Sequence, residues 1–247
     1  MPLDIYQIAL SPLDEDRFDI PSARASGVTI ERVPEMIAFC REHGVTFLIA
    51  RSRATDLNAA QAMERQGFLL MDTLVYWTRS LRESAIPPDT NDVPVRLMRS
   101  ADGEQVIAVA VESFRDYFGH YHADERLERT RCDAVYTSWA EKSCSREMAD
   151  EVLVADLKGS VAGFATLRMD SSEEGEGVLF GVAPTAQGRG IYRSLMIRGM
   201  EWCAARGAAR MVVSTQITNT AVQKVWARLG FELSHANYTF HRWFPTR

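Results

Sequence analysis

An internal repeat constrains the fold of this 247-residue chain more than any other feature of its sequence. When residues 21–70 are placed on residues 184–233 without a gap, ten of the fifty pairs are identical. The identical pairs are Pro21/Pro184, Ala23/Ala186, Gly27/Gly190, Cys40/Cys203, Gly44/Gly207, Thr55/Thr218, Arg65/Arg228, Gly67/Gly230, Phe68/Phe231 and Leu70/Leu233. Coincidence is the alternative, but it would give far fewer matches without gaps. We therefore expect two copies of one loop–helix–strand–helix–strand unit.

Residues 83–92 predict a linker between the two units. This stretch contains Pro87-Pro88, Asp89, Asn91 and Asp92 and has no periodic apolar pattern. We expect a truncated, degenerate unit over residues 1–82 and a complete unit over residues 93–247. The second copy of the repeat is preceded by about ninety residues that can complete a full domain.

The second unit alternates predicted strands and helices. The expected strands are 93–99, 151–156, 161–169, 177–182, 210–215 and 231–240, and the expected helices are 101–118, 127–144, 190–206 and 219–229. Gly207 and Gly230 stand where two of the helices should stop. Strands that alternate with helices after an initial meander predict an α/β fold with a sheet of mixed direction.

The composition is that of an ordinary globular protein, with 46% hydrophobic and 25% charged residues. No apolar run approaches the ~20 residues that cross a bilayer, and residues 1–10 lack the features of a secretory signal. We therefore expect a cytoplasmic protein that does not bind membranes. The four cysteines show no CxxC pairing and no zinc-ligand spacing, so reduced thiols are favoured over a disulfide or a metal site.

The charge is unevenly distributed along the chain. The net charge is −5, but residues 187–247 contain nine Lys/Arg and two Glu, which leaves residues 1–186 at −12. A basic segment on an acidic protein indicates a local anionic ligand rather than nucleic acid. A solvated basic helix face is the alternative.

A glycine-rich turn from Val182 to Tyr192 indicates where that anion binds. An apolar strand ends at Val182, and a helix is expected from Gly190. Backbone N–H groups in the first turn of a helix have no intrahelical partner, and the helix dipole adds a positive field. Gly188 and Gly190 leave room for a diphosphate to reach those groups, and Arg189 and Arg193 add charge near the same end. The turn matches neither the Walker loop nor the Rossmann fingerprint.

Gln187-Gly188-Arg189-Gly190 resembles the Gln/Arg-x-x-Gly-x-Gly/Ala motif of the GNAT acetyltransferases. The resemblance continues through Asn219-Thr220-Ala221-Val222 and Arg228-Leu229-Gly230-Phe231 and covers about residues 93–243. It implies the GNAT fold, a mixed and mostly antiparallel sheet flanked by helices, here with a truncated GNAT-like half in tandem. It also implies acetyl-CoA or another acyl-CoA as co-substrate, held in a V-shaped opening between two parallel strands.

The resemblance implies a set of cofactor-binding residues. Phe180, Gly181 and Val182 would pair with the pantetheine arm; Gln187, Gly188, Arg189, Gly190, Ile191 and Tyr192 would hold the diphosphate; and Asn219, Lys224 and Trp226 would reach the cofactor from the next helix. Tyr192 departs from the motif, which has Gly or Ala there, so we expect its ring to point away from the phosphates. The matching turn of the first copy, residues 24–29, keeps one glycine and lacks basic neighbours at the helix start, so we expect no coenzyme A there.

Glu176 is the candidate general base. Its two-residue spacing from Val178, Phe180 and Val182 places all four on one strand face, and several GNAT enzymes carry an acid there. A solvated loop carboxylate or a chain of waters is the alternative. Many family members place a tyrosine acid seven residues after the motif asparagine, but that position here is Trp226, whose indole does not release its proton at neutral pH.

An aromatic segment is the candidate wall for the acceptor. Tyr117, Phe118, His120, Tyr121 and His122 suit stacking on a sugar or base, and the histidines could bind a phosphate or act as bases. A packed helix end is the alternative. No third ligand accompanies the two histidines, so no metal is expected.

The two-part layout more loosely resembles the TDP-fucosamine acetyltransferase-like nucleotide-amino-sugar N-acyltransferases. That resemblance implies a nucleotide-linked amino sugar as the acceptor. The alternatives are another small amine, antibiotic or protein N-terminus, and a non-catalytic acyl-CoA-binding module. The expected partner is thus a small-molecule amine, and the chain is expected to be a monomer or homodimer.

Overall fold

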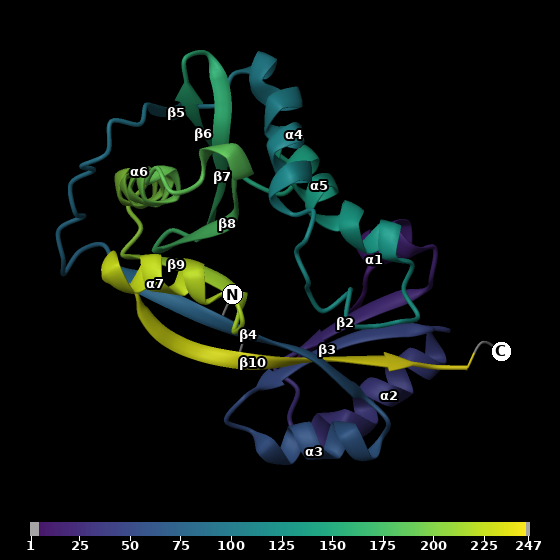
Figure 1. Ribbon diagram of the computed structural model, residues 1–247. Coiled ribbons are helices and arrows are strands. Elements are labelled where there is room, and N and C mark those ends of the chain that lie inside the picture. The colour runs from purple at the N-terminus through teal and green to yellow at the C-terminus, as the bar shows by residue number, and fades with distance from the viewer. Residues whose placement is uncertain (1–4, 246–247) are drawn as a thin grey trace.

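The computed structural model describes residues 5–245, and one mixed sheet of ten strands runs through them (Figure 1). The strands are β1 Gln7–Leu10, β2 Ser22–Ser26, β3 Phe47–Arg53, β4 Leu69–Ser80, β5 Val95–Leu97, β6 Glu151–Leu157, β7 Ser160–Ser171, β8 Glu174–Val182, β9 Arg210–Gln216 and β10 Glu232–Trp243. The helices are α1 Pro12–Phe18, α2 Val33–Glu42, α3 Leu57–Arg65, α4 Gly103–Ser113, α5 Arg129–Cys144, α6 Ile191–Ala205 and α7 Thr220–Arg228. None of these helices is long and apolar enough to cross a membrane.

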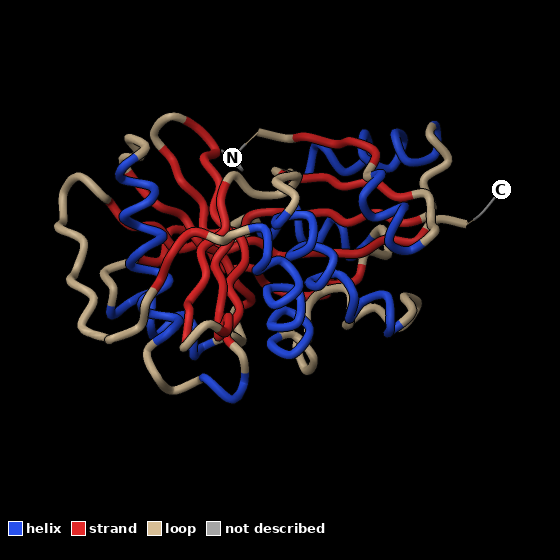
Figure 2. The backbone as a smooth tube through the Cα atoms, turned by 90° about the horizontal axis from the view of Figure 1, so that it is seen from above, coloured by secondary structure: helices blue, strands red, loops and turns tan. Residues whose placement is uncertain are grey.

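The sheet order is β1-β2-β3-β10-β4-β9-β8-β7-β6-β5, and only the β2–β3 and β8–β9 pairs are parallel. The prediction of a mixed, mostly antiparallel sheet flanked by helices is therefore confirmed. Figure 2 shows the strands of both units as one layer with helices packed against it.

The repeat appears as a twofold relation between the two halves of the sheet. The elements β3, α3 and β4 lie 163 positions before β9, α7 and β10, with matching bounds. The central β4–β10 register is symmetric about Leu74↔Asn237: Thr78 pairs with Glu232, and Leu69 pairs with His241, 163 positions beyond Thr78. The ungapped sequence match thus reflects real structural equivalence over this part of the chain.

Each unit ends with a strand that lies in the other half of the sheet. Strand β4, the last strand of the first copy, pairs with β9, whereas β10 pairs with β3. Residues 81–94, where a linker is expected, contain no helix or strand. The division into residues 1–82 and 93–247 stays a prediction. Because of this strand exchange, each part contributes one strand to the half of the sheet formed by the other.

The ungapped match is wrong at its start. Ser22 pairs with Phe47, and Glu174 pairs with Arg210. Phe47 and Arg210 are 163 positions apart, but Ser22 and Glu174 are only 152 apart. The first copy therefore lacks eleven residues between strand and helix, and Arg24 lies in β2 rather than in a loop.

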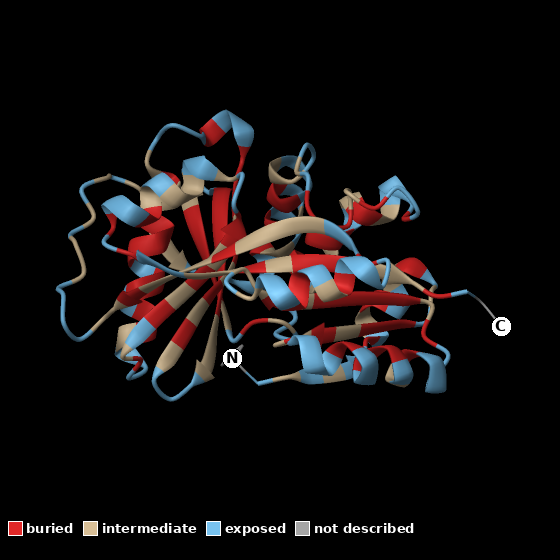
Figure 3. Ribbon diagram, turned by 90° about the horizontal axis from the view of Figure 1, so that it is seen from below, coloured by how far each residue is buried: buried red, intermediate tan, exposed pale blue. Residues whose placement is uncertain are grey.

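The helices cover the two faces of the curved sheet (Figure 1). Helices α1, α4 and α5 lie over its concave face, and α2, α3 and α6 lie over its convex face. Two apolar cores result: one under α2 and α3, with Met36, Met63 and Phe240, and a larger one in the second half, with Phe164 and Leu195. Figure 3 shows the buried strands and the half-exposed helices that cover them.

Helix α4 is shorter than the sequence predicts. It ends at Ser113 rather than at Phe118, and the aromatic residues that follow pack against α5: the Phe114 ring stacks on Tyr136 at 4.7 Å.

Strand β8 contains a bulge. Its pairing register shifts at Val178, so the strand has one extra residue there. A Cβ on Gly175 would meet Cys203 of α6, whereas one on Gly181 would meet Phe164 and Ser113 on the other face.

This shift changes which residues share a face. Glu176 faces opposite to Gly175, on the concave side, whereas the Phe180 ring lies 5.5 Å from Tyr192 of α6. The prediction that equal spacing puts Glu176, Phe180 and Val182 on one face is therefore wrong, because a bulge reverses the alternation that the spacing assumes.

Candidate active site

The central opening of the second unit lies between β8 and β9. The parallel pairing of these strands runs only from Glu174↔Arg210 to Gly177↔Val213. Beyond that point both strands continue, to Val182 and Gln216, without pairing to each other. The edge of β8 that faces β9 is therefore available to a ligand along Phe180–Val182.

A cavity of about 790 Å³ begins at this opening and reaches the start of α6. The turn before α6 has Gly188 at φ 76° and Gly190 at φ 78°, backbone conformations that favour glycine. No side chain caps α6 at Gly190, so its first-turn N–H groups have no intrahelical or capping partner. A Cβ on Gly188 would meet nothing within 4 Å. This turn therefore fits an anionic group such as a diphosphate.

Most of the predicted cofactor-binding residues line this cavity: Phe180, Gly181, Val182, Gln187, Gly188, Gly190, Ile191, Tyr192 and Asn219. Three do not. Arg189 and Lys224 are exposed beside it, and Trp226 is buried and lines a neighbouring cavity. The binding roles of all twelve stay predictions.

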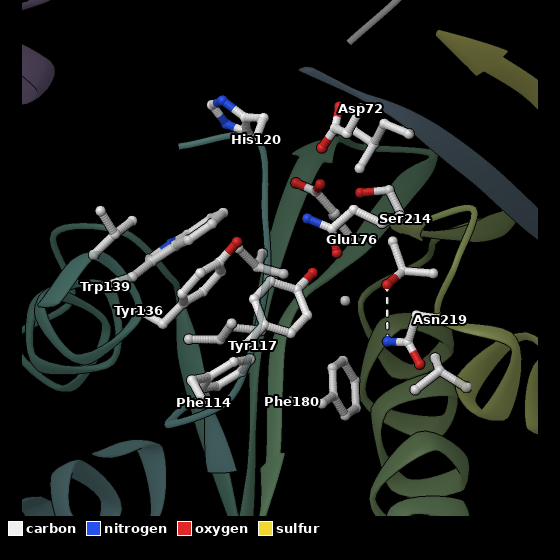
Figure 4. Close-up of a pocket in the computed structure, with 18 of the residues that line it drawn as sticks. Asp72, Phe114, Tyr117, His120, Tyr136, Trp139, Glu176, Phe180, Ser214 and Asn219 are labelled. Atoms are coloured by element: carbon white, nitrogen blue, oxygen red, sulfur yellow. Dashed lines mark hydrogen bonds between the residues drawn. The ribbon is translucent and has the colours of Figure 1, made fainter. Parts of the chain in front are cut away.

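The second cavity, of about 370 Å³, lies on the concave side of the sheet (Figure 4). Its floor comes from strands of both units, with Arg51 of β3, Asp72 of β4 and Glu176 of β8 among the lining residues. Aromatic side chains form one wall in Figure 4, where Phe114, Tyr117, Tyr136 and Trp139 are labelled. Seven residues line both cavities: Phe114, Tyr117, Phe180, Tyr192, Gln216, Asn219 and Val222. The two cavities thus share walls at the strand opening.

Glu176 is the titratable group nearest to this junction on β8. Its Oε2 accepts a hydrogen bond from Arg168 of β7 at 2.5 Å. Burial raises the pKa of Glu176 above its ordinary value, against the opposing charge of Arg168. A half-buried carboxylate in a cavity with a raised pKa suits proton transfer near neutral pH, so the base role stays a prediction with physical support.

The family model for the acetyltransferase (GNAT) family matches residues 107–231, just over half of the chain.

The chain belongs to the GNAT family.

Curated relatives extend beyond that match. The chain is 24% identical over 204 residues to the spore coat polysaccharide biosynthesis protein SpsD of Bacillus subtilis strain 168, an alignment that covers 80% of this chain and 66% of that protein. It is 26% identical over 208 residues to the mycothiol acetyltransferase of Acidothermus cellulolyticus, with 76% and 60% covered. The chain thus spans two thirds or less of the length of these relatives.

Solved structures share the fold. A GCN5-related N-acetyltransferase from Sphaerobacter thermophilus superposes with a TM-score of 0.67 and 14% identity, over 96% of this chain and 76% of that chain. A tandem GNAT protein from the clavulanic acid biosynthesis pathway gives a TM-score of 0.61 and 14% identity, over 92% and 77%. The predicted GNAT fold in a tandem arrangement is confirmed.

The two departures from the GNAT motifs contact each other. The indole Nε1–H of Trp226 donates a hydrogen bond to the hydroxyl oxygen of Tyr192 at 3.0 Å. Tyr192 extends from the second residue of α6 toward the opening and lines both cavities, and burial raises the pKa of its hydroxyl. A protonated tyrosine hydroxyl is therefore present in this GNAT site although Trp226 occupies the position seven after Asn219.

The predicted acceptor residues take different positions. Tyr117, His120 and Tyr121 line the second cavity, and Phe118 lines the first, with much of its ring exposed. His122 lines neither cavity: its Nδ1 accepts from the Gly119 amide at 3.1 Å, and its Nε2 lies 3.1 Å from Asp133. Contacts of these five residues with an acceptor stay predictions. The hydrogen bonds of His122 instead connect residues 119–122 to Asp133 of α5.

His120 belongs to a buried hydrogen-bonded chain. Asp124 Oδ2 lies 3.0 Å from His241 Nδ1, and His241 Nε2 lies 2.9 Å from His120 Nδ1. The carboxylate requires a proton on His241 Nδ1, so His241 Nε2 accepts from His120 Nδ1–H. Burial lowers the pKa of His120 well below its ordinary value, with His241 and Arg51 adding to the effect. His120 is therefore a neutral imidazole whose Nε2 is an acceptor.

Sequence reasoning missed the residues that come from the first unit or from flanking segments. They are Arg17, Arg24, Arg51 and Asp72 in the second cavity, and Arg228 in the first. Arg228 could have been found, since it lies in a motif that carries the resemblance. The others gave no signal, because only the strand exchange brings them to the site. Among residues 5–245 no group of three or more His, Cys, Asp or Glu side chains is arranged to hold a metal ion.

Proposed function

We propose that the protein is an acyl-CoA-dependent N-acyltransferase that moves an acyl group, acetyl in the simplest case, directly from coenzyme A to a primary amine. The observation that supports this most is the junction of the two cavities at the unpaired ends of β8 and β9. The turn predicted to bind the diphosphate lies at the far end of one cavity, and the half-buried carboxylate of Glu176 lines the other. A thioester and an amine that enter from opposite sides would meet at this junction.

The cofactor would follow the unpaired edge of β8. Its diphosphate would accept hydrogen bonds from the free N–H groups at the start of α6, with Arg193 and Arg228 adding positive charge. Arg193 is already oriented by Asp89, 3.3 Å away, and by the Pro88 carbonyl. The thioester would then lie beside Phe180 and Asn219, which line both cavities.

The chemistry requires two proton movements. The amine must lose a proton to attack the thioester carbonyl, and Glu176 is the carboxylate placed to receive it. As the C–N bond forms and the C–S bond breaks, the sulfur gains negative charge. Because Trp226 donates to the Tyr192 oxygen, the hydroxyl proton of Tyr192 is free to donate to that sulfur.

A nucleotide-linked amino sugar is the acceptor we favour. The second cavity combines aromatic rings, which suit stacking on a sugar or base, with arginines, which suit phosphates. The relative SpsD is named for polysaccharide biosynthesis, which agrees with a sugar substrate, whereas other relatives are named mycothiol acetyltransferase.

A thiol-release assay with acetyl-CoA and a panel of amines tests the proposal. The panel would hold a dTDP-linked amino sugar, glucosamine, a polyamine, an aminoglycoside and a peptide with a free N-terminus. We expect coenzyme A release that depends on the amine and is fastest with the nucleotide-linked sugar. Tight acetyl-CoA binding without release for any amine would favour a binding module, and turnover only with polyamine or peptide would exclude a sugar acceptor.

A further inference from the structure

One face of the sheet carries charged residues from both units in a row of adjacent strands. Thr239 of β10 pairs with Arg51 of β3 on one side and with Asp72 of β4 on the other. Directly paired residues point to the same face of a sheet. Arg24 of β2 pairs with Ile49, two residues before Arg51, and so shares that face. This concave face is the floor of the second cavity.

The first-unit end of the floor has more guanidinium groups than carboxylates. Asp14 of α1 is fully buried and accepts from Arg24 Nε at 2.5 Å and from Arg24 Nη2 at 2.8 Å. The same carboxylate also lies 3.8 Å from Arg17 Nη1. Within residues 5–245 the Arg51 side chain has the Thr239 hydroxyl, at 3.4 Å, as its hydrogen-bond partner and has no carboxylate partner. Among the described residues, one carboxylate therefore serves two of the three arginines that line the cavity, and Arg51 has none.

These arginines remain able to bind a ligand. The Arg24 side chain is 41% exposed although Asp14 behind it is fully buried. The Nε of Arg17 is buried without a partner in the described part of the chain. Because Asp14 is hydrogen-bonded to Arg24, the positive charges of Arg17 and Arg51 are not fully compensated. Uncompensated charges in a partly closed space are unfavourable unless an anion enters.

The middle of the floor has the opposite character. Both carboxylate oxygens of Asp72 are buried and have no hydrogen-bond partner among residues 5–245. Figure 4 draws Asp72, Ser214 and Glu176 on the same side of the pocket. A cationic amine would find its complement here, next to the junction with the cofactor cavity.

We propose that the first unit is the acceptor-recognition half of the enzyme, in which Arg17, Arg24 and Arg51 bind a phosphate or diphosphate group of the acceptor while Asp72 attracts its amine toward Glu176. The inference rests on the proposed N-acyltransferase function. Four strand spacings separate β3 from β8 in the sheet order, or about 19 Å between their backbones. The anionic group is thus several bonds away from the amine, unlike the carboxylate of an α-amino acid.

Arg24 shows how the first unit could acquire this role. In the structural alignment that pairs β2 with β8, Ser22 corresponds to Glu174 and Arg24 to Glu176. The two units thus place opposite charges at equivalent positions, and the strand exchange joins both positions to one cavity.

Calorimetry with phosphate probes tests the site directly. Inorganic pyrophosphate and dTDP are titrated into the full chain saturated with coenzyme A, so that the turn before α6 is occupied. We expect both to bind, with dTDP tighter if the nucleoside is also held. Arg51→Gln should weaken binding about tenfold, and Arg51→Lys less, because a guanidinium can form paired hydrogen bonds with phosphate. Arg41→Gln, on the exposed side of α2, is the matched control and should bind as the native chain does.

Acceptor kinetics extend the test to Asp72. With glucosamine 6-phosphate or a dTDP-linked amino sugar, Arg51→Gln should raise KM about tenfold and leave kcat within about twofold, whereas glucosamine should respond little. Asp72→Asn should raise KM for every amine. Acetyl-CoA affinity should stay unchanged in both variants, which shows that they fold.

Three results have distinct meanings. Unchanged affinity for both phosphate probes in Arg51→Gln, or no binding to the native chain, would overturn the inference even if amines are turned over. Equal KM changes for glucosamine and its 6-phosphate would also overturn it. Arg51-dependent binding of the probes without acyl transfer to any amine would uphold the anion site and instead reject the proposed function.

Discussion

The two halves of the sheet share one arrangement of strands and helices but differ at one place. In the second half, the pairing of β8 and β9 stops at Gly177↔Val213, and the strands separate. In the first half, β2 and β3 pair from Ser22↔Phe47 to Ala25↔Ala50, and the Val28 amide then donates to the Arg51 carbonyl at 3.1 Å. The first half is therefore closed where the second is open.

The cause is the eleven-residue difference between the copies. Those residues supply the end of β8, its bulge and the turn before α6 in the second unit. Without them the chain passes from β2 to α2 through Gly27, where a Cβ would meet the Ile5 carbonyl at 2.7 Å. The comparison shows that equivalent helices and strands surround an opening between two strands in one copy and a closed strand pair in the other.

The prediction with the largest expected effect concerns whether residues 93–247 fold without the strand that the first unit contributes. Residues 93–247 expressed alone lack β4, which lies between β9 and β10. We expect this piece to be insoluble or unfolded, because both strands would expose an unpaired edge. Co-expression of residues 1–86 with 87–247 should restore a soluble complex that binds acetyl-CoA, measured by gel filtration and calorimetry. A stable, active 93–247 piece would show that the second unit does not need the first.

The second prediction concerns the position where the halves carry opposite charges. Glu176→Gln should lower kcat/KM for acyl transfer about 100-fold while leaving acetyl-CoA affinity unchanged, because the amide cannot accept the amine proton. In the native chain, kcat/KM should fall as the pH drops below the raised pKa of Glu176, at a pH above its ordinary 4.5, since the base is needed deprotonated. That acidic limb should vanish in the variant.

Glu173→Gln serves as the control for this prediction, since Glu173 is a neighbouring carboxylate that is 63% exposed and pairs with Arg82. It should keep native activity and the native pH profile. If both variants have native rates, a chain of waters rather than Glu176 removes the proton.

The third prediction, of intermediate size, compares acetyl-CoA affinity after substitution of two arginines at equivalent positions of the two copies. Arg65 and Arg228 occupy equivalent positions of the repeat, at the ends of α3 and α7, but only Arg228 lines the cavity that contains the predicted diphosphate turn. Arg228→Gln should weaken acetyl-CoA binding about fivefold to tenfold, more at low salt, because a charged contact is lost. Arg65→Gln should leave the affinity unchanged. Equal affinities in a calorimetric titration would mean that α7 does not contact the phosphates.

The smallest effect concerns stability. Arg79 of β4 is buried and donates to the Leu229 carbonyl at the end of α7, and to the Ala85 carbonyl at 2.7 Å. Its repeat counterpart Arg242 lies against Gly67 and over the Phe68 ring. These are packing contacts, whereas Arg79 also donates hydrogen bonds to two backbone carbonyls. Arg79→Met should lower the free energy of unfolding by about 2 kcal/mol, and Arg242→Met by less than about 1 kcal/mol.

Urea unfolding followed by circular dichroism measures the free energy of unfolding of both variants. A larger loss for Arg242→Met would contradict the view that Arg79 holds α7 to the exchanged strand.

Local patterns in the sequence were enough to predict much of the second unit. Gly207 and Gly230 do end their helices at positive φ, as do Gly44 and Gly67 in the first copy. The fold class and the turn before α6 follow from such short-range signals, because helix ends and strand-to-helix turns depend on a few adjacent residues, and the tandem arrangement follows from the ungapped repeat. The face of Phe180 was not predictable, since a one-residue bulge leaves no mark on the spacing.

The sequence alone determined the family, the repeat and the residues around the predicted diphosphate site, because all three are recorded in contiguous motifs. Only the tertiary structure decided that β4 and β10 exchange places, and that Arg24, Arg51 and Asp72 therefore share a cavity with Glu176. Strand order depends on pairing between segments far apart in the chain, so charges that complete a site from another unit carry no local signal.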